Sequence, residues 1–499
     1  MAAPWNGQPQ WWLQLISLGA LAWQLQREAS WRRGFLQGWV FAIAWLTATF
    51  WWLFISMHVY GGLAAPLAVA AVLGLAAFLG LYYAAACGIF VALARTGASW
   101  GAIVFAALWL LAELLRGSLF TGFPWGAGAY AHVDGLLAGY APWVGAYGMS
   151  FVAAMVACGL VGVARYHLAA ATAPLGALAV GLMLAQSGGY TVDSGSTTVT
   201  LLQGNIAQDE KFQSGTGVPM ALNWYGGQLR EAKTGLVVAP ETAIPLLPQQ
   251  LPDGYLSAVA GRFFGGNQAA LIGIPLGNAS EGYTNSVIGM KPGAAEDLYH
   301  YDKHHLVPFG EFIPPLFRWF TDLMNIPLGD FNRGAMGQAS FEWQGQRFAL
   351  NICYEDLFGE ELGALFADPQ QAPTVFVNVS NIAWFGNTVA IDQHLAISRL
   401  RALEFERPML RATNTGATAI IDHHGRVTHS LQRHTRGVLV GEVQGRSGIT
   451  PFAWWVSRAG LWPLWLLAIL VIALAAARRN RVPDDPLSAF EPSAPAGPR

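Results

Sequence analysis

The sequence predicts an α-helical membrane domain with several spans, joined to an aqueous domain of mixed α and β structure. Of its 499 residues, 54% are hydrophobic and only 12% are charged, whereas ordinary soluble domains are roughly 25% charged. Long apolar runs fill the N-terminal part and recur near the C-terminus, and most of the charge lies between them. These observations indicate a membrane protein that carries one folded aqueous domain.

The predicted spans are apolar runs of a length that can cross a bilayer, or nearly so. They lie at 11–25, 35–57, 62–94, 101–116, 137–164, 168–186 and 459–477. We therefore predict a membrane domain at 1–190 with about six spanning helices and a final transmembrane helix at 456–480. The Pro- and Ala-rich tail at 481–499 is predicted to be disordered and cytoplasmic.

The segment at 191–455 has a different pattern. Short β-branched runs alternate with turn residues, as in TVTLLQGNI, TGLVVAPE, AALIGIPLG, FALNICYE and TVFVNVSN. Such runs, bounded by Gly, Pro and Asn, are typical of strands and their connections. We expect a folded aqueous domain of mixed α and β structure here.

Arginines mark one side of the predicted membrane domain. They follow the first, third, fifth and seventh spans, as Arg27, Arg32, Arg33, Arg95, Arg165, Arg478, Arg479 and Arg481. Because short cytoplasmic loops are enriched in Lys and Arg, this side is predicted to face the cytoplasm and the aqueous domain the opposite side. With seven spans and this distribution of arginines, the N-terminus is predicted to lie outside. MAAPWNGQPQ, however, has no basic segment of the kind that a signal peptide carries. A further span before it, or a re-entrant first segment, would explain this.

Several classes of partner are not predicted. The net charge of -2 and the absence of a basic stripe argue against nucleic acid. Two of the three cysteines lie in apolar runs, where they act as small hydrophobes, and no Cys-x-x-Cys pair occurs. The adjacent pairs His304-His305 and His423-His424 would point to opposite faces of a strand. We predict no metal and no cofactor.

Three reactive side chains stand where predicted strands end. GLVVAPETAIP runs into Glu241, Lys303 heads the loop in HYDKHHLVPFGEF, and RFALNICYED delivers Cys353 to a turn. The acids that follow the cysteine disfavour a thiolate, but a nearby ammonium offsets them and lowers the thiol pKa. A carboxylate beside the sulfur can remove its proton. The Lys and the backbone N–H after the Cys could then donate to an oxyanion.

This order of Glu, Lys and Cys resembles the nitrilase, or carbon–nitrogen hydrolase, superfamily, whose domain is an α-β-β-α sandwich. With the membrane domain, the chain resembles the apolipoprotein N-acyltransferase family from about residue 35 to about 477. The likeness rests on RGSLFTGFPW, LLQGNIAQ, APETAIP, YDKHHLVPFGEFIP, ICYE, AWFG, RALEFERPMLRATNTG and GLWPLW, all in order.

The resemblance implies a triad of Glu241 as general base, Lys303 as transition-state stabiliser and Cys353 as nucleophile. It also implies supporting or substrate-binding roles for Glu311, Asn285, Phe212, Tyr354 and Glu355.

The chain departs from the family's pattern at two positions. The family usually has Trp at the position of Phe212, where ring packing could survive without the indole N–H. It usually has Asp at the position of Ile382 in SNIAWFG, which puts any polar role there in doubt.

The implied reaction has two half-steps. Cys353 takes an acyl chain from a phospholipid, phosphatidylethanolamine being the family's usual donor, and forms a thioester. The α-amino group of a lipoprotein's diacylglyceryl-cysteine then takes the chain. The implied location is the bacterial cytoplasmic (inner) membrane, crossed several times, with the catalytic domain on the periplasmic side.

Two further features are open to two interpretations. Glu113 and Arg116, spaced i and i+3, could anchor a helix end at the headgroups or hold the following loop near a lipid substrate. The segment VPFGEFIPPLFRWFTDLM could be ordinary core or a lid in the outer leaflet. Its apolar residues are Phe309, Phe312, Ile313, Phe317, Trp319, Phe320 and Leu323.

Other functions also fit parts of the sequence. His394 could form a papain-like pair with Cys353. A membrane-anchored nitrilase-type amidase would use the same triad but has no need of so many spans. A transporter would need polar residues or an inverted repeat in the spans, and few polar residues and no evident repeat occur there.

Overall fold

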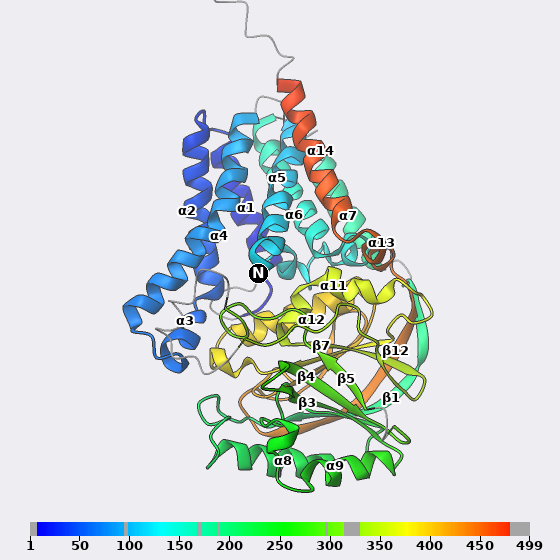
Figure 1. Ribbon diagram of the computed structural model, residues 1–499. Coiled ribbons are helices and arrows are strands. Elements are labelled where there is room, and N and C mark those ends of the chain that lie inside the picture. The colour runs from blue at the N-terminus through cyan, green and yellow to red at the C-terminus, as the bar shows by residue number, and fades with distance from the viewer. Residues whose placement is uncertain are drawn as a thin grey trace, which may run out of the picture.

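A computed structural model describes residues 7–93, 98–166, 172–186, 189–294, 298–313 and 330–479. A bundle of helices stands on a sandwich of two β-sheets, with helices α11 and α12 between the two parts (Figure 1). The tail predicted to be disordered lies outside the described residues, as do the short segments between those ranges.

Each predicted apolar run contains a helix. The bundle consists of α1 (Trp11–Leu25), α2 (Trp31–Phe50), α3 (Leu53–Ile55), α4 (Ala65–Leu93), α5 (Ala98–Ser118), α6 (Ala141–Tyr166), α7 (Thr172–Gln186) and α14 (Trp462–Arg479). A π-helical turn, η1 (Ser56–Tyr60), follows α3, and 3₁₀ turns form η3 (Leu119–Thr121), η4 (Gly128–His132) and η5 (Ala138–Tyr140).

Not all of these helices are long enough to span a bilayer. Within the described residues, four qualify by length and hydropathy, at Ala65–Leu93, Trp100–Thr121, Ala138–Val161 and Trp462–Arg479. A pair bent by 62°, Trp31–Phe50 and Leu53–Tyr60, makes a fifth if it counts as one span. Helices α1 and α7 have 15 residues each, about 22 Å at 1.5 Å per residue. The seven-span count therefore stays a prediction.

Small residues allow α2 and α4 to pack closely. A Cβ atom added to Gly38 would lie 2.6 Å from the Cβ of Cys87, and one added to Gly34 would lie 2.5 Å from Val91. Glycine at such a contact lets two helix backbones approach in a membrane, where dispersion drives packing. Cys87 and Cys158 are both buried, which confirms that they act as core residues.

The sandwich has two six-stranded sheets. The first has the order β12 (Gly437–Gly448), β1 (Thr191–Gln203), β2 (Leu236–Val238), β3 (Ala269–Asn278), β4 (Gly282–Met290) and β5 (Tyr299–Asp302). The second has the order β11 (Val427–Ser430), β10 (Ala419–Ile421), β9 (Met409–Thr413), β8 (Val375–Ser380), β7 (Gln346–Ile352) and β6 (Phe341–Trp343). β1, β2 and β3 are parallel, as are β7, β8 and β9.

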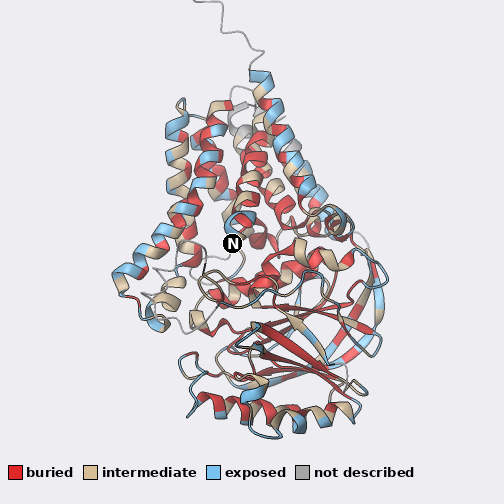
Figure 2. Ribbon diagram, in the orientation of Figure 1, coloured by how far each residue is buried: buried red, intermediate tan, exposed pale blue. Residues whose placement is uncertain are grey.

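Helices cover the outer face of each sheet. The helices α8 (Gly217–Glu231) and α9 (Tyr255–Phe264) pack on the first sheet, with one face in water (Figure 2). The second sheet is covered by α11 (Gly359–Gly363), α12 (Ala390–Phe405) and α13 (Pro451–Ala459). Strands β8 and β9 are buried along their whole length, as expected for parallel strands covered on both faces. The layers are thus α-β-β-α.

Helix α12 joins the two parts because it is buried on both sides. Ala402 and Phe405 pack with the second sheet, while Ile391 and Leu400 belong to the core of the bundle. Gln393 bridges the parts with polar contacts. Its side-chain oxygen accepts hydrogen bonds from the indoles of Trp52 (3.0 Å) and Trp125 (2.8 Å), and its amide donates to the Thr49 carbonyl (2.9 Å).

Arg116 and Glu113 hold the loop that follows α5. The Arg116 guanidinium donates to the carbonyls of Phe123 (2.8 Å) and Trp125 (2.7 Å). The Glu113 carboxylate accepts from the backbone N–H of Gly128 (2.9 Å). Both charged residues are buried within the protein, which favours the interpretation in which they hold the following loop. They shape this loop, which contacts the sandwich at Gly122.

Replacing Gln393 should weaken the junction. Gln393→Leu removes the indole partner of Trp125, and a buried donor without a partner costs about 1–3 kcal/mol. We expect a lower thermal unfolding midpoint in detergent. Asp392→Asn is the matched control because the adjacent Asp392 makes only a partly exposed ion pair with Arg433, worth roughly 0.2–1 kcal/mol. Equal midpoints for the two variants would contradict the assigned role of Gln393.

Candidate active site

Cys353 lies at the tip of a strained turn between β7 and the 3₁₀ turn η8 (Cys353–Leu357). Its φ of +53° is in the left-handed region that residues other than glycine seldom adopt. Two side chains hold the turn: the Asn378 amide and the His394 Nε2 each lie 3.1 Å from the Cys353 carbonyl. Such strain persists only where the surroundings fix it, and here it presents the thiol at the end of the strand.

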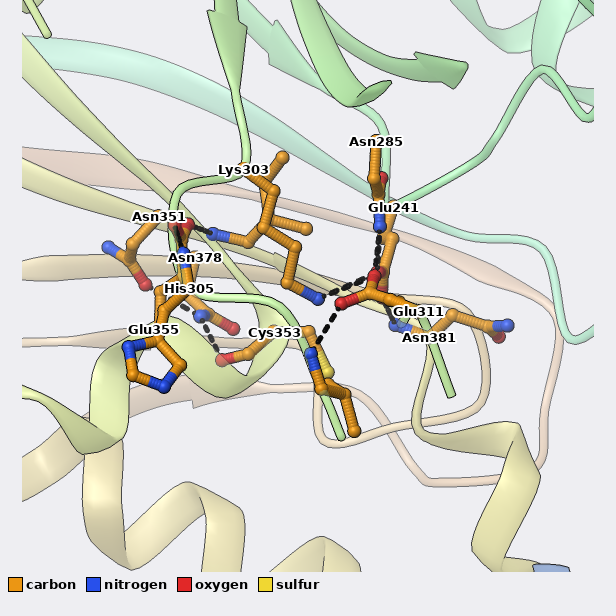
Figure 3. A network of polar contacts seen from close by, with 12 residues as sticks. Glu241, Asn285, Lys303, His305, Glu311, Asn351, Cys353, Glu355, Asn378 and Asn381 are labelled. Atoms are coloured by element: carbon orange, nitrogen blue, oxygen red, sulfur yellow. Dashed lines mark hydrogen bonds and ion pairs between the residues drawn. The ribbon is translucent and has the colours of Figure 1, made fainter. Parts of the chain in front are cut away.

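The carboxylates and the lysine predicted from the sequence meet at this turn (Figure 3). The Lys303 ammonium lies 2.8 Å from the Glu311 carboxylate and 3.6 Å from Glu241. The Asn285 amide donates to both carboxylates at 2.7 Å, and the backbone N–H of Asn381 donates to the second Glu241 oxygen at 2.7 Å. The structure therefore brings Glu241, Asn285, Lys303 and Glu311 into one buried cluster beside the half-buried Cys353.

The charges in the cluster keep one another ionised. Burial opposes the charge of Glu241, but the Lys303 ammonium and the Asn285 amide outweigh it and hold its pKa below the usual value. Burial also opposes the charge of Lys303, but Glu311 and then Glu241 raise its pKa well above that of a free lysine. Glu241 is thus an ionised base and Lys303 a fixed cation.

The thiol itself is protonated at rest. Burial and the nearby Glu241 charge raise the pKa of Cys353 to about 12, although Lys303 acts in the opposite direction. The sequence predicts a lowered thiol pKa, and this prediction is wrong: Lys303 does lower it, but burial and Glu241 raise it by more. Two carboxylates already share the ammonium, so its charge is not free to stabilise a thiolate. The arrangement suits removal of the thiol proton during the reaction rather than before it.

Glu355 lies outside this cluster and joins the loop that follows Lys303 to the Cys353 turn. Its carboxylate accepts from the backbone N–H groups of Ile352 (2.6 Å), His304 (2.7 Å) and His305 (3.1 Å), and from the Tyr301 hydroxyl (2.9 Å). The first belongs to the cysteine strand and the next two follow Lys303. Burial raises the pKa of Glu355 to about 7.

Tyr354 connects the cysteine turn to the loop after α5. Its hydroxyl donates to the Gly122 carbonyl (3.0 Å), and its ring stacks on Phe123 with centroids 6.4 Å apart. His305, on the lysine loop, reaches the same segment because its Nε2 donates to the Thr121 carbonyl (2.9 Å). The loop after α5 therefore accepts hydrogen bonds from both the Lys303 loop and the Cys353 turn through its backbone carbonyls.

The two departures from the family's pattern differ in their setting. Phe212 is 47% exposed and lies over the neighbouring Lys211, whose ammonium is 5.8 Å from the ring centroid. Phe212 is therefore at the edge of the cluster and not in it. Ile382 is buried in the core shared with the membrane helices, which explains an apolar residue at that position.

His394 is not placed as a base for Cys353. Its Nε2 faces two acceptors, the Cys353 carbonyl and the Asp356 carboxylate (2.9 Å), so this nitrogen must carry the proton. Ser398 donates to the other Asp356 oxygen at 2.5 Å. This geometry supports the cysteine turn and does not favour a papain-like pair. Within the described residues, no group of three or more His, Cys, Asp or Glu is arranged to hold a metal ion.

Part of the predicted lid lies outside the described residues. Those positions include Phe317, Trp319, Phe320 and Leu323, while Phe309, Phe312 and Ile313 are described. Phe312 packs under Arg333, whose guanidinium carbon is 5.0 Å from the ring centroid. The lid stays a prediction.

Sequence reasoning missed several residues of the site. Lys211 donates to the Glu241 carbonyl, and Asn378 and Asn381 hold the cysteine turn and the Glu241 carboxylate. The asparagines lie in the strand segment TVFVNVSN, where a buried polar residue among apolar ones is a usable signal. Lys211 gave no such signal, because a lone lysine in a loop is ordinarily a solvated charge.

Comparisons with known proteins fit this architecture. Residues 1–159 match the family model described as the apolipoprotein N-acyltransferase N-terminal domain, and residues 198–450 match the carbon-nitrogen hydrolase model. The solved structure of an amidase from Nesterenkonia sp. aligns with 56% of this chain and 100% of its own, at 16% identity and a TM-score of 0.39. The fold and the site define a nitrilase-like carbon–nitrogen hydrolase domain on a helical membrane domain, which confirms the predicted fold class.

Full-length relatives give the particular family. A protein of Verminephrobacter eiseniae named apolipoprotein N-acyltransferase is 61% identical over 486 residues, which cover 92% of this chain and 90% of that protein. One of Ralstonia nicotianae with the same name is 46% identical over 478 residues, covering 94% and 90%. The chain belongs to the apolipoprotein N-acyltransferase family, as the motifs predicted.

Alkylation of Cys353 should report the protonated thiol. With a pKa of about 12, the thiolate fraction, and so the rate of reaction with iodoacetamide, should keep rising through pH 10. The same shift makes the native state less stable as pH rises from about 9 to about 12, because only the unfolded thiol ionises there. Rates measured at Cys353 by mass spectrometry test this. A plateau between pH 7 and 9 would show a thiolate at rest and contradict it.

Proposed function

We propose that this protein transfers an acyl chain from a phospholipid, phosphatidylethanolamine in the first instance, to the α-amino group of the diacylglyceryl-cysteine of an apolipoprotein. Family membership supports the acceptor class. The observation that carries the proposal is the position of the Cys353 turn, which Tyr354 joins to a loop of the membrane helices at Gly122. A nucleophile tied to that loop is placed for esters that stay in the membrane.

The first half-reaction forms a thioester. Glu241 takes the proton of the Cys353 thiol as the sulfur attacks the ester carbonyl. Lys303 and the backbone N–H of Tyr354 stabilise the oxyanion, a contribution of roughly 2.7–4 kcal/mol per donor. The carbon–oxygen bond then breaks, Glu241 returns the proton to the leaving oxygen, and a lysophospholipid departs.

The second half-reaction transfers the chain. The neutral α-amino group of the acceptor attacks the thioester carbonyl, and Glu241 accepts the proton that the nitrogen loses. The carbon–sulfur bond breaks, and the proton held by Glu241 returns to the Cys353 sulfur. The products are the N-acylated lipoprotein and the free enzyme, so no cofactor is consumed.

Both substrates are lipids, so we place the protein in the bacterial cytoplasmic membrane with its catalytic domain on the periplasmic side. The arginines predicted to be cytoplasmic support this. Arg478 and Arg479 end α14 at the pole of the bundle opposite the sandwich (Figure 1). Arg27 lies in the loop that joins α1 and α2, and Arg32 lies in the first turn of α2. The lipid-anchored acceptor would reach the cluster from the outer leaflet.

Incubation with phosphatidylethanolamine should leave an acyl group on Cys353. We expect mass spectrometry of the purified protein to find the adduct on this residue alone and lysophospholipid in equal amount. Cys353→Ser serves as the control and should form no thioester. An enzyme that hydrolyses small amides without forming the lipid adduct would instead be the membrane-anchored amidase, and an active Cys353→Ala variant would exclude the proposed nucleophile.

Substitutions of Lys303 and His394 should distinguish a residue that takes part in the reaction from one that only holds the cysteine turn. Lys303→Ala removes the stabilising charge, and we expect thioester formation to fall by 10²-fold or more. His394→Ala removes one hydrogen bond to the Cys353 carbonyl and should cost less, about tenfold. The rate of the first acylation turnover measures both. If only the His394 change abolished acylation, the Glu-Lys-Cys assignment would fail.

A further inference from the structure

Lys211 is a second buried cation beside the candidate active site. It lies in the turn between β1 and α8, and only 2% of its surface is exposed. Its ammonium donates to the backbone carbonyl of Glu241 at 3.1 Å and lies under the ring of Phe212. Its charge acts on the Glu241 carboxylate and on the Cys353 sulfur. The mechanism above gives this residue no task.

The turn that carries Lys211 is fixed by a chain of amides. The side-chain oxygen of Asn414 accepts from the backbone N–H of Ile206 (3.0 Å), and its amide nitrogen donates to the carbonyl of Ile206 (2.7 Å). Asn414 also donates to the Asn381 side chain at 2.9 Å, and Asn381 donates to Gln208 at 2.8 Å. The backbone N–H of the same Asn381 bonds Glu241. This network of buried amides therefore fixes the position of the Lys211 turn relative to Glu241.

The charges of the cluster balance only when Lys211 is counted. Glu241 and Glu311 each bring a negative charge, whereas Lys303 alone can neutralise just one of them. A buried charge without a partner is costly, by several kcal/mol per ion. Asp209 and Glu210 precede Lys211 in the chain and are at least partly exposed. Arg411 is another buried cation near Cys353, but it is paired with Asp356, so we assign the balance of the second carboxylate to Lys211.

We propose that Lys211 is a positioning residue for the acyl transfer, which keeps the four-charge cluster neutral and so allows the Cys353 thiol to give its proton to Glu241. This rests on the function proposed above. Transfer of the proton from sulfur to Glu241 leaves the total charge unchanged, so with Lys211 present the cluster is neutral before and after the step. Without Lys211, the thiolate would form in a cluster that carries an excess negative charge.

Alkylation of Cys353 by iodoacetamide tests this without any lipid, so it can fail while the acyl-transfer function stands, and the reverse. All variants carry Cys87→Ala and Cys158→Ala. At pH 7, we expect Lys211→Met to slow alkylation at least tenfold. Lys233→Met, a change of an exposed lysine at the end of α8, is the matched control and should leave the rate unchanged.

A second charge change tests whether Lys211 acts through its charge or only through its packing. Adding Glu311→Gln to Lys211→Met removes one negative charge, and the double variant should return to within about threefold of the parent rate. Burial lowers the pKa of Lys211 to about 8. The lysine is charged below this pH and neutral above it, so the parent and Lys211→Met rates should converge by pH 10. A packing role of Lys211 would leave the deficit of the Lys211→Met rate unchanged between pH 7 and pH 10.

Folding is checked through the thermal midpoint of each variant, and Lys211→Gln replaces Lys211→Met if the latter does not fold. A parent-like rate at pH 7 in a folded Lys211→Met protein would overturn the proposal. So would a double variant as slow as the single one, or a rate deficit that stays constant from pH 7 to pH 10.

Discussion

The contact between Lys303 and two carboxylates is the constraint on which the rest of the site depends. Buried ions are tolerated only when charge and hydrogen bonds are both satisfied. Asn285 bridges Glu241 and Glu311, and the backbone N–H of Asn381 takes the remaining Glu241 oxygen. These partners come from both sheets of the sandwich. The cluster can therefore form only when the two sheets are packed in register, which links the chemistry to the fold.

The membrane helices complete this site as well as hold it at the membrane. The lysine loop and the cysteine turn each bond a carbonyl of the loop after α5, at Thr121 and Gly122. Arg116 fixes the same loop from inside the bundle through the Phe123 carbonyl. A chain of contacts thus runs from a buried arginine in the membrane part to the residue next to the nucleophile. This gives a physical reason for one polypeptide to carry both parts.

The sequence could predict that Glu241, Lys303 and Cys353 lie near one another, because each follows a strand: β2 and β5 of the first sheet and β7 of the second. It could also predict the two-part architecture, since apolar runs and β-branched runs differ in composition. Phe212 was predicted for the site, but its side chain lies at the rim, because only the three-dimensional path of the turn decides whether residue 211 or 212 faces inward. The thiol pKa could not be predicted either. It depends first on the burial of the thiol and then on the carboxylates that lie near it, and only the fold sets both.

A protonated thiol in a neutral cluster suits an enzyme that must hold an acyl group until a second lipid arrives. Burial disfavours the thiolate, so the resting Cys353 is poorly reactive toward adventitious electrophiles. In the proposed mechanism, the ionised Glu241 carboxylate takes the thiol proton only when an ester carbonyl is in place. The thiol is therefore less reactive at rest but stays available for the lipid, because it lies beside two carboxylates that share one buried lysine.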